Sequence, residues 1–85
     1  MKIRVLGILV SNRVKEAIEV QNLLTKYGCI IKTRLGLHEV GNSCARNGLI
    51  IIELTGDENE WRKLQDELSV IEGVDIQNMD FQYND

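Results

Sequence analysis

The chain has 85 residues, a formal net charge of −3, two cysteines, 44% hydrophobic residues and 27% charged residues. This length suits one domain with a modest core, and the acidic balance disfavours a direct nucleic-acid surface. Two cysteines make no disulfide framework, and no apolar run approaches the ~20 residues that span a bilayer. The first residues enter a strand pattern directly, without a signal peptide. We therefore expect a single cytoplasmic domain over residues 1–85, with no membrane or nucleic-acid partner.

The first predicted element is a strand over residues 3–10 that is largely apolar on both faces. Side chains alternate between the faces of a strand, so odd and even positions separate them. Gly7 in its middle predicts a close backbone approach or a bulge. A helix is predicted over residues 14–27, and Gly28 is placed to end it. Its apolar stripe is formed by Val14, Ala17, Ile18, Val20, Leu23, Leu24 and Tyr27.

A second strand is predicted over residues 29–37, where Lys32 and Arg34 suit an edge position. We expect Cys29, which opens this strand, to lie in the core. A long hairpin loop over residues 36–48 leads into a third strand over residues 49–54. This strand is also apolar on both faces, with Ile50, Ile52 and Leu54 on one face and Leu49 and Ile51 beside Glu53 on the other.

The last third of the chain predicts a helix and a strand. Asp57 suits the N-cap of the helix, and Gly73 is expected to end it. The final strand covers residues 74–83, and its apolar positions change parity between Ile76 and Met79, which predicts a bulge near residues 77–78. The buried stripe of the helix is expected to be Trp61, Leu64, Leu68 and Ile71.

The order β-α-β-β-α-β predicts an α+β, ferredoxin-like fold, in which two helices cover one face of a four-stranded antiparallel sheet. The first and third strands lie in the centre of such a sheet, and these are the two most apolar strands. Their second face has no cover of its own. We therefore expect this face, or an edge of the sheet, to pack on another copy of the chain.

Few residues indicate chemistry, because the motifs of metallochaperones, RNA-recognition modules, iron–sulfur ferredoxins, phosphate loops and catalytic serines are absent from the sequence. The hairpin loop contains His38, Glu39, Cys44 and Arg46. A histidine, a carboxylate and a thiol together suit nickel or zinc. The alternative interpretation is a histidine hydrogen-bonded to backbone at a surface or interface, and a cysteine that is a small buried hydrophobic residue.

A second candidate site is a small-anion site. Arg34 and His38 lie toward one end of the second strand, where Asn12 and Arg13 approach if the first strand–helix loop lies close. Solvated charges on an edge strand are the alternative interpretation.

Four segments carry a resemblance to a known family: Ile3–Val10, Leu23–Ile31, Arg34–Leu37 and Val70–Val74. They resemble the small ACT-like proteins called iron-only hydrogenase system regulators, which are similar in fold to the C-terminal ligand-sensing domain of nickel-responsive repressors. The resemblance implies a non-enzymatic, regulatory, oligomeric domain that senses a small ligand. The chain has one histidine, whereas the nickel sites of the repressors use several, and it has no DNA-binding segment.

We therefore expect a homodimer or homotetramer that binds a small effector or a regulatory partner protein, without a cofactor and without enzymatic activity. Asn12, Arg13, Arg34 and His38 are the predicted ligand-binding residues. Two alternatives remain. One is a metal-responsive binding protein that uses His38 and Cys44, and the other is a structural oligomerisation module.

Overall fold

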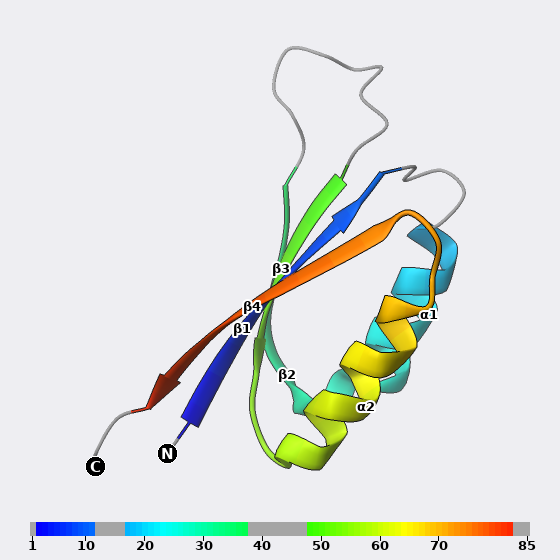
Figure 1. Ribbon diagram of the computed structural model, residues 1–85. Helices are drawn as coiled ribbons and strands as arrows, with labels where there is room; N and C mark the ends of the chain where they lie inside the picture. The colour runs from blue at the N-terminus through cyan, green and yellow to red at the C-terminus, as the bar shows by residue number, and fades with distance from the viewer. Residues whose placement is uncertain (1, 12–16, 38–47, 83–85) are drawn as a thin grey trace.

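The computed structural model describes residues 2–11, 17–37 and 48–82. The strands form one antiparallel sheet in the order β2-β3-β1-β4, and both helices pack on one face of it (Figure 1). This arrangement confirms the predicted α+β, ferredoxin-like βαββαβ fold with the first and third strands in the centre. The elements are β1 (Lys2–Val10), α1 (Ala17–Lys26), the 3-10 helix η1 (Gly28–Ile30), β2 (Ile31–Leu37), β3 (Gly48–Leu54), α2 (Glu58–Ser69) and β4 (Val74–Gln82). Neither helix in this part of the chain is long and apolar enough to cross a membrane.

The core lies between the helices and the sheet face that they cover. Even-numbered residues of β1 and β3 point into it, and Trp61, Leu64 and Leu68 of α2 face them. The helix ends at Ser69, before the predicted end at Gly73, so the fourth predicted stripe residue, Ile71, lies beyond it and is partly buried. Full burial of one such aliphatic side chain contributes roughly 1.5–3 kcal/mol, so this layer dominates the hydrophobic stabilisation. The buried hydrophobic residues are Leu6, Ile8, Val10, Val20, Leu24, Tyr27, Ile30, Ile52, Leu54, Trp61, Leu64 and Leu68.

Local sequence signals set the limits of α2. Asp57 is its N-cap as predicted, because the Asp57 side chain accepts the backbone N–H of Asn59 at 2.9 Å. Gly56 and Gly73 have φ angles of 82° and 83°, in the left-handed region that favours glycine. They lie in the turns that separate α2 from β3 and from β4, so the chain can reverse direction at both places.

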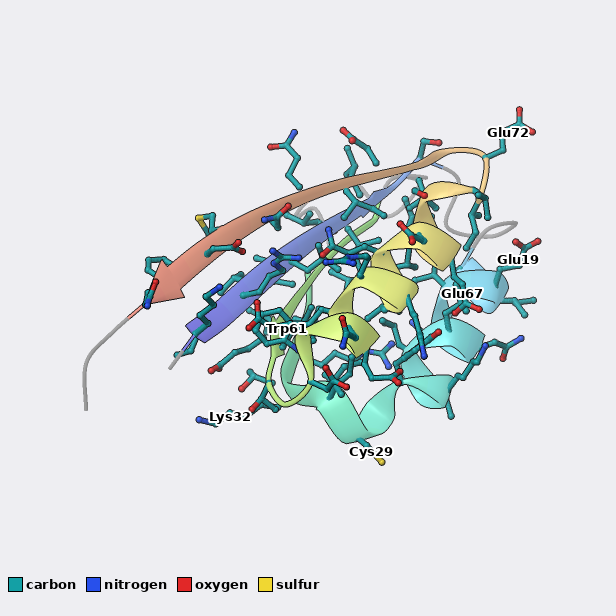
Figure 2. All side chains as sticks on the ribbon, turned by 60° about the horizontal axis from the view of Figure 1, so that its bottom comes forward. Glu19, Cys29, Lys32, Trp61, Glu67 and Glu72 are labelled. Carbon is teal, nitrogen blue, oxygen red and sulfur yellow. The ribbon has the colours of Figure 1, made fainter. Side chains whose placement is uncertain are left out.

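Three predictions around α1 are wrong. The helix ends at Lys26, and Gly28 opens the 3-10 turn instead of adopting a left-handed conformation. This turn directs Ile30 into the core, so Cys29 is exposed and its sulfur points away from the body of the protein (Figure 2). Ile18 is 67% exposed because it lies on the opposite side of the helix from Val20 and the rest of the buried stripe.

The predicted bulges in β1 and β4 are also wrong. The two strands pair in unbroken register from Lys2↔Gln82 to Val10↔Val74, and the one irregularity of the described sheet lies in β2, between residues 31 and 33. The apolar side chains of β4 therefore change from one face of the sheet to the other without a bulge. Ile76 packs against the core, whereas Met79 is exposed on the other face.

Candidate functional site

The connections that carry the predicted site residues leave the sheet at one end. Val10 pairs with Gly48 and with Val74, and Leu37 pairs with the neighbouring Leu49. The backbone N–H and the hydroxyl of Ser11 both donate to the Gly73 carbonyl, at 2.8 and 2.9 Å. Asn12, Arg13 and His38 themselves lie outside the described residues, so the small-anion site stays a prediction.

Arg34 is the described member of that predicted set. It lies on the edge strand β2, opposite Ile52, on the side of the sheet that the helices cover. Its guanidinium donates to the Gln21 side-chain oxygen of α1. The structure therefore assigns Arg34 at least one structural contact, which ties the edge strand to the first helix.

The metal interpretation rests on the hairpin loop. His38, Glu39, Cys44 and Arg46 lie outside the described residues. Within residues 2–11, 17–37 and 48–82, no group of three or more His, Cys, Asp or Glu side chains is arranged to hold a metal ion. The metal alternative therefore also stays a prediction.

Arg4 forms a polar cluster on the helix-covered side of the sheet. Its Nε and Nη2 atoms donate to the two carboxylate oxygens of Asp80 at 2.7 and 2.8 Å, and Nη1 donates to Gln65. The guanidinium also lies 5.5 Å from the centre of the ring of Trp61, a buried residue in the first half of α2. The hydrogen bonds from Arg4 lower the pKa of Asp80, and Asp80 raises the pKa of Arg4. These contacts join β1, β4 and α2. Because the charges of Arg4 and Asp80 are already paired with each other, we interpret the cluster as structural.

A second polar cluster joins the two helices. Lys26 Nζ donates to Glu67 Oε1 at 2.9 Å and lies 5.3 Å from the centre of the Tyr27 ring. Hydrogen bonding to Glu67 raises the pKa of Tyr27 to about 12, and the same interaction lowers the pKa of Glu67. The Lys26–Glu67 ion pair is partly exposed to solvent, so it contributes little stability by itself. We interpret this cluster as a helix–helix contact.

The largest unexplained feature is the sheet face that points away from the helices, called here the open face. The residues that belong to this face are identified from the strand pairing and from the alternation of side chains along each strand. Three large apolar residues on it, Leu35, Met79 and Phe81, are 52%, 58% and 53% exposed. The apolar residues of the open face are Ile3, Val5, Leu9, Leu35, Leu49, Ile51, Met79 and Phe81, with Gly7 between them.

A hollow of about 450 Å³ lies on the open face, above the central strand β1. Gly7 lies between Ile51 of β3 and Gln77 of β4, its paired neighbours in the sheet. Val5 and Leu9 stand on either side of it along the strand. The hollow therefore exists where the central strand lacks a side chain. Its lining residues are Val5, Gly7, Leu9, Leu49, Ile51, Asp75, Gln77, Asn78 and Met79.

None of these lining residues was among the predicted ligand-binding residues. The sequence contained one signal for the hollow, which was a glycine in the middle of a strand that is apolar on both faces. We predicted a bulge or a close backbone approach at Gly7. A Cβ atom there would meet only the Gln77 carbonyl oxygen, at 3.7 Å, which is ordinary van der Waals contact. The glycine thus leaves open space instead of allowing a close approach.

No family model and no curated protein sequence matches the chain. Solved structures do match it. The uncharacterized protein TM1266 from Thermotoga maritima superposes with a TM-score of 0.83 and 24% identity, over 96% of this chain and 100% of that one. The apo form of CPII from Thiomonas intermedia K12, a nitrogen regulatory PII-like protein, has a TM-score of 0.60 and 16% identity, over 98% of this chain and 92% of that one.

CPII bound to ADP, AMP and acetate gives a similar match, with a TM-score of 0.59 and 16% identity, over 99% of this chain and 90% of that one. At these identities the likeness concerns the fold. Together with the observed strand order, it defines the chain as a small ferredoxin-like α+β protein.

Proposed function

We propose that the chain is a non-enzymatic regulatory domain that binds a small ligand and acts as a homodimer or homotetramer in the cytoplasm. The observation that carries the proposal is the apolar open face of the sheet, on which Leu9, Leu35, Met79 and Phe81 are exposed. The resemblance to iron-only hydrogenase system regulators supports a regulatory role of that kind. The likeness in fold to CPII, a nitrogen regulatory PII-like protein bound to ADP, AMP and acetate, is consistent with ligand sensing on this fold.

The size of the open face suits a second copy of the chain. Strands lie about 4.8 Å apart and rise about 3.3 Å per residue. Four strands of seven to nine residues therefore present roughly 500 Å² in plan. Two copies packed face to face would bury roughly 1,000 Å² in total, without counting the additional area of protruding side chains. This area reaches the lower limit for a specific interface.

The two acidic residues on the described part of the open face do not prevent such packing, because one is already paired and the other lies at the end of the face. Glu53 already has partners, because its carboxylate lies 3.9 Å from Lys32 Nζ and accepts a hydrogen bond from Thr33 at 3.3 Å. Asp75 lies at the end of the face, opposite Leu9. An uncharged centre with a polar rim is typical of a protein–protein interface.

Mass measurement by light scattering at micromolar concentration tests the assembly. We expect a dimer or tetramer for the wild type and a monomer for Leu35→Glu and for Met79→Glu, because a charge buried in an apolar interface is costly. Both residues are more than half exposed in the single chain, so its fold tolerates the change. Ile18→Glu is the matched control, since Ile18 is exposed on α1, away from the open face.

A wild-type monomer under these conditions would contradict the proposed assembly. Loss of assembly in Ile18→Glu alone would place the interface on the helices instead. An assembled chain that binds no small molecule would favour the structural oligomerisation module over the ligand sensor.

A further inference from the structure

We propose that the hollow above Gly7 binds a small, mainly apolar molecule that carries a hydrogen-bond donor and no negative charge. The inference deepens the proposed function and rests on it, because pairing of two open faces encloses the hollow. It specifies the ligand class and a site that differs from the predicted anion-binding residues.

The size and walls of the hollow suit such a molecule. Its volume of about 450 Å³ falls within the roughly 300–1,000 Å³ of small-molecule sites. Five of its nine lining residues have apolar side chains: Val5, Leu9, Leu49, Ile51 and Met79. Burial of an apolar molecule against these walls supplies the driving force for binding.

The backbone does not require glycine at position 7. Among the described residues, positive φ angles occur at Gly56 and Gly73 and not at Gly7. A methyl group at position 7 meets only ordinary contact distance, and strand interiors disfavour glycine. The consequence of glycine that the structure shows is therefore the space above it.

The polar groups of the hollow select the charge of the ligand. They are the carboxylate of Asp75 and the amide of Gln77, whereas the side chain of Asn78 lies on the helix-covered face and donates to Asp80. Among the described residues, no Lys, Arg or His lines the hollow. A carboxylate accepts hydrogen bonds and attracts cations. An anion enclosed beside it would have no counter-charge among the described lining residues, and burial of an unpaired charge is strongly unfavourable. The hollow therefore disfavours nucleotides and carboxylates, the chemical classes represented by the ADP, AMP and acetate bound to CPII.

Titration with indole tests the site, since indole is neutral, apolar and carries one N–H donor. The readout is backbone amide NMR of the full chain, with light scattering on the same samples. We expect saturable shifts at the amides of Gly7, Ile51 and Asp75. Gly7→Val fills the hollow and is expected to weaken indole binding at least tenfold without loss of assembly, and Gly7→Ala is expected to weaken it less.

Gly36→Val is the matched control. Gly36 is a strand glycine that pairs with Ile50, and no atom lies within 4 Å of a Cβ built on it. We expect this variant to bind indole as the wild type does. Asp75→Lys tests the charge rule: the wild type should prefer tryptamine to indole-3-acetate, and this variant should reverse the order.

Two results would overturn the inference. One is indole binding that is unchanged by Gly7→Val. The other is an assembled wild type in which indole shifts no amide around the hollow, because the partner copy then fills it. A monomeric wild type that binds indole at Gly7 would support this site while contradicting the proposed assembly, so the two failures are distinguishable.

Discussion

The two central strands carry mainly apolar side chains on both faces of the sheet, but the helices cover only one of these faces. On the helix-covered face, Leu6, Ile8 and Ile52 are completely buried. On the open face, Leu9, which is in β1 like Leu6 and Ile8, is 41% exposed. The βαββαβ order supplies two helices, and both pack on one face (Figure 1). Hydrophobic side chains on a strand therefore do not form a core by themselves, because a second layer must cover them.

The faces also differ in their polar groups. The helix-covered side pairs its charges internally, as in the contacts of Arg4 with Asp80 and of Lys26 with Glu67. The open face instead presents Asp75 and the Gln77 amide beside an apolar hollow. We therefore expect the stability of the fold to depend mainly on the helix-covered side, and we propose the open side for binding.

The largest expected effect contrasts neighbouring isoleucines of β3. Ile52→Ala is expected to lower the free energy of unfolding by about 2–5 kcal/mol, because it leaves a cavity in a fully buried site. Ile51→Ala, on the open face, is expected to cost about 1 kcal/mol in the monomer. Urea unfolding at concentrations where the chain is monomeric measures both values. Equal losses would remove the distinction between the faces.

A smaller effect is expected at the start of the helix layer. Asp57→Ala removes the side-chain acceptor for the Asn59 N–H and is expected to cost about 1 kcal/mol of unfolding free energy. Asp66→Ala is the control, an exposed acidic residue in the same helix but outside its N-cap. The same urea experiment compares the two variants, and a control as destabilised as Asp57→Ala would show that the cap adds nothing specific.

The smallest expected effect is a dependence of stability on acid pH. The pKa of Asp80 is lowered by its hydrogen bonds from Arg4, and the pKa of Glu67 is lowered by those from Tyr27 and Lys26. A carboxyl group whose pKa is lower in the folded state stabilises the fold above its unfolded pKa, and this stabilisation disappears as the pH falls through the folded pKa. We therefore expect the free energy of unfolding to decrease below about pH 4.

Asp80→Asn separates the contribution of the Arg4 cluster. This variant is expected to be less stable than the wild type at pH 7 and to lose less stability between pH 5 and pH 3. Thermal unfolding across this range measures the difference. A variant with the same acid profile as the wild type would show that Asp80 does not contribute to it.

The element order, the central and edge strands, the buried residues Trp61, Leu64 and Leu68 of α2 and its cap at Asp57 could all be predicted from the sequence. These features depend on local periodicity and local hydrogen bonding, which the residues carry wherever the chain lies. The same local logic failed at Cys29 and Ile18, because the turn after α1 and the rotation of the helix decide which neighbours point inward.

The tertiary structure alone decided which face of β3 the helices cover. Alternation is symmetrical, so Ile52 and Ile51 are equally apolar in the sequence, and the contact with α1 and α2 distinguishes them. It also decided the meaning of Gly7. A glycine in a strand permits a bulge, a close approach or an open space, and only the positions of Ile51 and Gln77 on the adjacent strands show that the space is open.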